Sequence, residues 1–132
     1  MLGSNDADSG LEGKKLEDAV KAYSENLRHI IEHRDIKRHS PHILLVTPPP
    51  VWDDDIKIHN NLATKDLEKK LRLYTRSSRM VEIFAAECRR LGKSLGVDVL
   101  DIHQITSERI KQDGTLHKLW FRDGTPSCVC MN

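Results

Sequence analysis

Two stretches of the chain carry apolar residues at the spacing of an amphipathic helix. In residues 16–33 the apolar positions recur every three or four residues, which places them on one helix face. This face comprises Leu16, Val20, Tyr23, Leu27, Ile30 and Ile31. In the second stretch, which starts firmly at Ser77 or Ser78, the face comprises Val81, Phe84, Ala85, Cys88, Leu91 and Leu95. Gly96 is a suitable stop signal, so we predict that this helix ends at Leu95.

Two short apolar runs predict β-strands, at residues 42–47 and 97–102. Three prolines follow the first run, and because proline lacks an N–H donor the chain must leave the sheet there. The first run is apolar without alternation, which is typical of a parallel strand covered on both faces. The order helix, strand, helix, strand therefore predicts a doubly wound, parallel α/β sheet.

The remaining segments give weaker signals. We expect a loop at residues 1–13, a polar connector at 34–41, a loop with the acidic residues Asp53, Asp54 and Asp55 at 51–61, a helical turn at 107–112, a packed apolar segment at 118–121 and an unstructured tail at 125–132. Two strands do not make a stable open sheet. We therefore interpret residues 1–124 as a partial domain whose missing strands precede Met1, and we expect self-association through exposed sheet edges.

Composition is typical of a soluble globular domain and excludes several functions. The chain has 132 residues, of which 38% are hydrophobic and 31% charged, with a net charge of +1. So balanced a charge gives no electrostatic signature of nucleic-acid binding. No stretch approaches the roughly 20 apolar residues of a membrane span, and residues 1–13 lack the pattern of a signal peptide. Cys88, Cys128 and Cys130 form no disulfide framework, so we expect a reducing, cytoplasmic location.

The block Gly3-Ser4-Asn5-Asp6 has the residue types that an oxyanion hole requires. Ester hydrolysis passes through a tetrahedral intermediate whose negative oxygen is stabilised by preorganised N–H donors. Gly3 allows a close approach of the backbone, and Asn5 offers an uncharged NH2 donor. By itself the block also fits an ordinary loop of Asn and Gly turn residues.

The sequence that follows the block favours the oxyanion hole. In order, its features are Ala7, the helical segment Tyr23-Ser24-Glu25-Asn26-Leu27, a strand ending in Thr47-Pro48-Pro49-Pro50, a helix bearing Ala85-Ala86-Glu87-Cys88, and the run Leu95-Gly96-Val97-Asp98-Val99-Leu100-Asp101. Residues 1–105 thus resemble the SGNH/GDSL hydrolase family, and within it the isoamyl acetate-hydrolysing esterase branch. The resemblance implies a flavodoxin-like, three-layer α/β/α fold. It also implies hydrolysis of small carboxylic esters by a serine nucleophile, with no metal or other cofactor.

The resemblance assigns roles to some residues and leaves others without a match. Asn5 matches the oxyanion-hole amide, Gly3 the first residue of its block, and Asp6 a loop-shaping acidic residue. The family's nucleophile lies in an early Gly-Asp-Ser sequence, which does not occur in this chain. The serines considered for this role lie in the wrong sequence context, and they are Ser4, Ser9, Ser24, Ser77 and Ser78.

The family's late Asp-x-x-His block is altered here. The run-in to that block is present at residues 119–124, but Thr125-Pro126 follows where Leu-His is due. Asp123 is the favoured equivalent of the triad Asp. His117 is an alternative base, but a surface His in a turn is the better interpretation. We therefore expect little or no serine-esterase activity from this chain alone, and we interpret its ends as those of an incomplete gene model. The alternative is a non-catalytic α/β interaction module.

Two further motifs have functional interpretations. His29-Ile30-Ile31-Glu32-His33 formally matches an inverted zinc-hydrolase motif. However, His29, Glu32 and His33 point away from the apolar stripe, so a solvated helix face is the better interpretation. The segment from Thr47 to Trp52 follows a strand, where open α/β sheets bind ligands. It is expected either to wall an acyl or alcohol pocket or to pack as a rigid loop. The spacing of Cys128 and Cys130 does not indicate redox chemistry.

Overall fold

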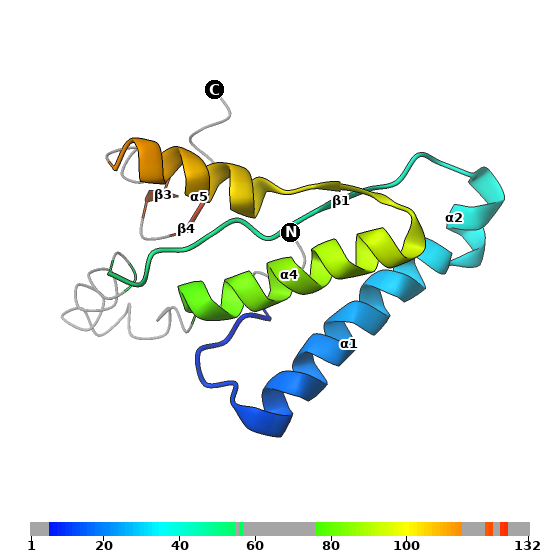
Figure 1. Cartoon of the computed structure of the whole chain (residues 1–132). Helices are drawn as coiled ribbons and strands as arrows, with labels where there is room; N and C mark the ends of the chain where they lie inside the picture. The colour runs from blue at the N-terminus through cyan, green and yellow to red at the C-terminus, as the bar shows by residue number, and fades with distance from the viewer. Residues whose placement is uncertain (1–5, 55, 57–75, 115–120, 123–124, 127–132) are drawn as a thin grey trace, which may run out of the picture.

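The computed structural model describes residues 6–54, 56, 76–114, 121–122 and 125–126 (Figure 1). Along the chain its elements are α1 (Gly13–Glu32), α2 (Arg34–His39), β1 (Leu44–Val46), α4 (Ser78–Leu95), β2 (Asp98–Leu100), α5 (Ile102–Gln112), β3 (Phe121–Arg122) and β4 (Thr125–Pro126). The two long helices and both central strands lie where the hydrophobic pattern predicts them. In the described part of the chain, no helix is both long and apolar enough to cross a membrane.

The centre of the fold is a parallel pair of strands joined through a helix. β1 pairs with β2 in parallel, with Leu45 opposite Val99 and Val46 opposite Leu100. α4 connects the two strands and contacts both of them, and α1 packs against α4 (Figure 1). The α/β class and the parallel pairing predicted from the sequence are therefore confirmed.

The core lies between this strand pair and the two long helices. Phe84 and Leu91 of α4 are fully buried, and the ring of Phe84 meets that of Tyr23 from α1 edge-on at a centroid distance of 5.2 Å. Such a T-shaped pair adds to the apolar burial that joins the helices. Gly92 lets α4 approach β2, because a Cβ atom at this position would lie 2.2 Å from Val99 Cγ2.

Both ends of α4 are fixed by their own sequence. The side chain of Ser77 accepts a hydrogen bond from the N–H of Met80 and caps the first turn. Gly96 ends the helix with a φ of 64°, a conformation that favours glycine. The acidic run was expected to be a loop, yet Asp53 accepts the N–H of Ser78 at 2.7 Å and its hydroxyl at 2.6 Å. Asp53 thus ties the segment after the three prolines to the positive end of α4.

The structure corrects three expectations about exposure and local structure. The polar connector contains a short helix, α2, because His33 accepts the N–H of Asp35 and caps it. Ile30 was assigned to the buried face of α1 but is 50% exposed. β1 is covered on one face only, since Leu44 is 51% exposed while Leu45 is buried. The reason for the last difference is that, among the described elements, α4 contacts one face of the strand pair and α1 packs on α4 from the same side.

The C-terminal part forms a second, very small sheet. β3 and β4 pair antiparallel, with Phe121 opposite Pro126 and Arg122 opposite Thr125. This pairing crosses the boundary expected after residue 124, so strand structure begins inside the segment expected to be an unstructured tail. The other residues of that tail, 127–132, lie outside the described part of the chain.

Candidate functional site

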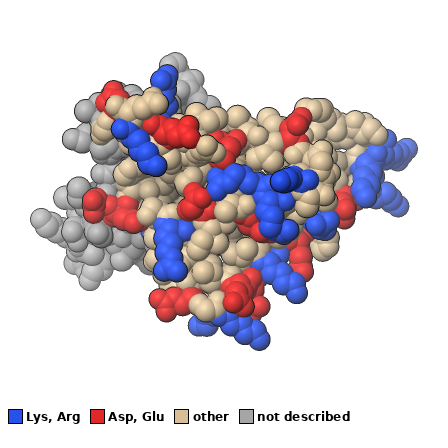
Figure 2. All heavy atoms as spheres, in the orientation of Figure 1, with Lys and Arg blue, Asp and Glu red and all other residues tan. Residues whose placement is uncertain are grey.

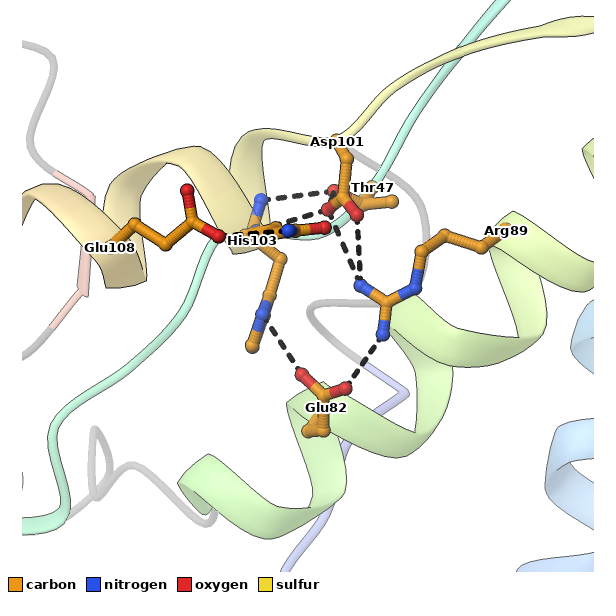
Figure 3. A network of polar contacts seen from close by, with 7 residues as sticks. Thr47, Glu82, Arg89, Asp101, His103 and Glu108 are labelled. Atoms are coloured by element: carbon orange, nitrogen blue, oxygen red, sulfur yellow. Dashed lines mark hydrogen bonds and ion pairs between the residues drawn. The ribbon is translucent and has the colours of Figure 1, made fainter.

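The site begins where the two parallel strands end. Thr47 follows β1 and Asp101 follows β2, and the strand register places them side by side. The hydroxyl of Thr47 donates to Asp101 Oδ1 at 3.0 Å and accepts the N–H of His103 at 3.0 Å. Thr47 is fully buried, so this one hydroxyl fixes the start of α5 against β1 (Figure 3).

Arg89 of α4 joins this strand end to the helix layer. One of its terminal nitrogens lies 3.1 Å from Asp101 Oδ2, and the other lies 2.6 Å from Glu82 Oε1. Burial by itself raises the pKa of Asp101, but hydrogen bonds from the N–H of Gln104, from Thr47 and from Arg89 outweigh it and hold that pKa below its usual value. Asp101 is therefore a stable carboxylate that also caps α5.

His103, the second residue of α5, completes the network. Its Nδ1 lies 2.9 Å from Glu82 Oε2, and its side chain is 12% exposed. Burial lowers the pKa of His103 and Arg89 adds to this effect, while Glu82 and Asp101 act in the opposite direction without reversing it. The imidazole is therefore neutral at neutral pH, with its Nδ1–H donated to Glu82. Among the described residues nothing hydrogen-bonds to Nε2, which leaves this nitrogen as an available base.

Two cavities adjoin this histidine. The first has a volume of about 570 Å³, with a wall formed by Pro50, Val51, Trp52 and Ile110. The second has a volume of about 550 Å³ and is lined by Glu82, Arg89 and Glu108. Three residues spaced four apart along α5 line both cavities, and they are His103, Ser107 and Lys111. This spacing puts them on one helix face.

The residues to which the sequence assigned catalytic roles lie near the two ends of the chain. Gly3, Asn5, Asp123 and His117 lie outside the described residues. The segment directly after the Gly3-Ser4-Asn5-Asp6 block is held in place, because Ala7 is fully buried in the core and Asp8 forms a bridge with Arg76.

The segment after β1 combines features of both of its interpretations. Pro48, Pro49 and Pro50 are buried. Val51 is 3% exposed and, together with Trp52, lines the first cavity. The segment is thus both packed on the domain and positioned as an apolar pocket wall.

The zinc interpretation loses its geometric basis. α1 ends at Glu32, and His33 takes an extended conformation with ψ 138°. His29 and His33 therefore do not lie one turn apart on a single helix, and both are exposed. Across the described ranges, no group of three His, Cys, Asp or Glu residues is placed to hold a metal ion.

Four residues of the network were not singled out by the sequence. They are Glu82, Arg89, Asp101 and His103. A usable signal existed for the last two, because Asp101 lies at the end of the strand predicted at 97–102 and His103 directly follows it, where ligand sites of α/β sheets lie. Glu82 and Arg89 are seven residues apart on α4 and so share a face. Sequence alone gives no reason to connect that face with the end of β2.

Basic and acidic side chains are interspersed over the face seen in Figure 2. Comparison of the chain with protein-family models, with curated proteins and with solved structures finds no match. The resemblance to SGNH hydrolases consequently rests on the motifs and on their order along the chain.

Proposed function

We propose that this chain belongs to the carboxylic ester hydrolases of the SGNH type, with a flavodoxin-like fold, and that it binds small esters beside His103. The observation that carries the proposal is the cavity at the carboxyl ends of β1 and β2. It combines an apolar wall with a neutral imidazole whose orientation is fixed by Glu82. Typical small-molecule sites combine apolar surface with well-placed polar groups. The polar part of this lining also includes Asp53, Asp54, Ser78, Ser107 and Lys111.

The lining matches the two ends of a small ester. Its alkyl parts would contact Val51, Trp52 and Ile110, and its carbonyl would face the polar side where His103 lies. By resemblance, Gly3 and Asn5 would supply oxyanion donors.

Binding is the sharpest test, since the missing Gly-Asp-Ser sequence predicts little or no turnover by the SGNH route. Isoamyl acetate is titrated into the ¹⁵N-labelled chain, and the amide and indole resonances are followed by NMR. We expect shifts at Val51, Trp52 and Ile110, which weaken in a Val51→Asp variant. The corresponding ether, which lacks the carbonyl, is the matched ligand and is expected to shift the apolar wall without shifting His103.

A third cavity, a groove that His103 does not line, provides an internal control for this titration. It lies between α1 and α4, has a volume of about 510 Å³ and has an apolar floor formed by Leu16, Val20 and Ile83. A purely hydrophobic ligand would enter either this groove or the first cavity beside His103. Shifts confined to this groove, or no shifts at all, would rule out an ester site beside His103.

The second candidate is a non-catalytic module that associates with another copy of the chain. Leu44, Val46 and Leu100 are 51%, 38% and 41% exposed, which leaves three apolar side chains on the uncovered face of the strand pair, beside the exposed ion pair of His42 and Asp98. Among the described strands, β1 pairs only with β2, so its other edge offers the same backbone groups in each copy. Pairing of β1 with β1 of a second copy would extend the sheet to four strands.

Light scattering tests this candidate. A dimer that dissociates in a Val46→Lys variant, without ester binding by either protein, would favour the module. A monomer at all concentrations would exclude it. Lys21→Glu, a substitution on the opposite, helical side, serves as the control for a nonspecific effect of charge.

A further inference from the structure

A hydroxyl group lies on the same helix face as the neutral histidine. Ser107 follows His103 by one helical turn, and the two residues line both cavities together. Helical side chains lean toward the N-terminus, so the Ser107 side chain is directed toward the turn that carries His103. Ser107 is partly buried, and its hydroxyl makes no hydrogen bond with any described residue.

The other serine on the first cavity has a different role. The Ser78 hydroxyl donates to Asp53 Oδ2 at 2.6 Å, and its N–H also bonds to Asp53. It is therefore committed to the capping of α4 and is poorly placed to attack a ligand. Of the two serines on this cavity, Ser107 has the uncommitted hydroxyl.

The base for such a hydroxyl is already oriented. Glu82 holds His103 Nδ1 at 2.9 Å, so the lone pair of the neutral ring is on Nε2. An acidic residue, a histidine oriented by it and a hydroxyl nucleophile are the three parts of a triad, and they are recognised by their roles rather than by their order along the chain. In structures without substrate, the contact between nucleophile and base is often long.

We propose that Ser107 is an acyl-accepting nucleophile, with His103 as its base and Glu82 as the residue that orients His103, acting on short carboxylic esters. This inference rests on the proposed ester site and names its nucleophile, which differs from the Gly-Asp-Ser serine of the SGNH resemblance. Lys111, on the same helix face, lines both cavities and would supply a positive charge for the oxygen that becomes negative.

The reaction balances as an ordinary ester hydrolysis. Ser107 Oγ forms a bond to the carbonyl carbon while its proton passes to His103 Nε2. The bond from that carbon to the alkoxy oxygen breaks, and the alcohol leaves with the proton from His103. Water then attacks the acyl-serine with His103 as base, which releases the acid and restores the hydroxyl of Ser107.

Intact-mass spectrometry after incubation with 4-nitrophenyl acetate tests the inference. We expect one added acetyl group, located on Ser107 by peptide mapping. The adduct is lost in Ser107→Ala and retained in Ser78→Ala, the matched serine on the same cavity. General-base catalysis contributes about 100-fold or more, so His103→Gln should slow acylation by at least that factor.

The possible failures are distinguishable. Acetylation at another residue, or acylation of Ser107 that is unchanged in His103→Gln, overturns the assignment of this nucleophile and base. Binding of isoamyl acetate beside His103 without any acylation also overturns it but leaves the proposed ester site intact. The absence of both binding and acylation removes the proposed function together with its nucleophile.

Discussion

The hydroxyl of Thr47 lies 3.0 Å from Asp101 Oδ1 and joins the residues that directly follow the two parallel strands. Because the same hydroxyl accepts the N–H of His103, it links the end of β1, the end of β2 and the first turn of α5. The position of His103 in the candidate site therefore depends on a buried residue that contacts neither cavity.

Removal of that hydroxyl should both destabilise the fold and disturb the site. In Thr47→Val the shape is kept, but the N–H of His103 loses its acceptor, and a buried group without its partner costs about 1–3 kcal/mol. Urea denaturation is expected to show a loss of that size. Thr47→Ser keeps the hydroxyl and should therefore retain most of the stability that Thr47→Val loses. Equal losses in both variants would mean that packing of the Thr47 methyl group, rather than the hydrogen bonds, is decisive.

Arg89 of α4 should contribute much more to stability than an arginine in an exposed surface ion pair. Arg89 bonds to both Glu82 and Asp101, and the Asp101 side chain is only 19% exposed. Arg89→Gln is therefore expected to cost about 1–3 kcal/mol, because a charged acceptor loses its partner. It should also raise the pKa of Asp101, as measured by NMR.

Arg28→Gln is the matched control for that experiment. Arg28 of α1 and its partner Glu32 are each 42% exposed, and their charged atoms lie 3.9 Å apart. Surface pairs of this kind contribute little. A loss of stability in Arg28→Gln as large as that in Arg89→Gln would contradict a special role for the network at the strand ends.

The close approach of α4 to β2 should not tolerate a methyl group. Alanine has a helix propensity about 1 kcal/mol better than glycine. At Gly92, however, the new Cβ atom would lie 2.2 Å from Val99 Cγ2 and 3.2 Å from the carbonyl oxygen of Val97. Overpacking of this kind typically costs about 1–3 kcal/mol, so Gly92→Ala is expected to be destabilised in thermal unfolding despite the gain in propensity.

A double-mutant cycle checks the origin of that loss. Val99→Ala removes the atom that the new methyl group would meet, so the loss caused by Gly92→Ala should be smaller in the Val99→Ala background. Additive losses would show that the strain arises elsewhere, for example at the carbonyl of Val97.

Stability should fall as the pH drops below 6.5. In the unfolded chain a histidine takes up its proton near that value, whereas burial, assisted by Arg89, lowers the pKa of folded His103. Just below 6.5 the unfolded state therefore binds more protons, and the free energy of unfolding decreases with falling pH. The contribution of neutral His103 to the free energy of unfolding is complete above pH 6.5, and it is lost as the pH falls toward the pKa of folded His103. His103→Gln should flatten this slope.

Exposed His42 provides the control for the pH experiment. Its side chain is 82% exposed, and its Nε2 lies 3.1 Å from Asp98 Oδ2. This pair lies at the amino-terminal ends of the strands, away from the candidate site. Comparison of the slope below pH 6.5 in His42→Gln with that in His103→Gln separates the loss of the buried histidine from the loss of an exposed one. If His42→Gln flattened the slope and His103→Gln did not, the buried histidine would not be the titrating group.

Most of the secondary structure could be predicted because its signals are local. The apolar spacing in α1 and α4, the serine cap and Gly96 depend only on residues a few positions apart. The three prolines likewise end β1 whatever surrounds them. Failures arose where a distant partner decides the outcome. Continuous apolarity cannot show whether a second layer of helices covers Leu44, and no local signal places Asp53 at the start of α4.

The sequence by itself thus determined the α/β class, the two long helices, the parallel strands and the motifs that resemble an ester hydrolase. Only the tertiary structure decided that Glu82 and Arg89 of α4 meet Asp101 and His103 at the ends of the strands. The physical reason is that periodicity fixes which face of an element is buried. The contacts between charged side chains depend instead on how closely α4 packs on β2, and Gly92 and the strand register set that distance.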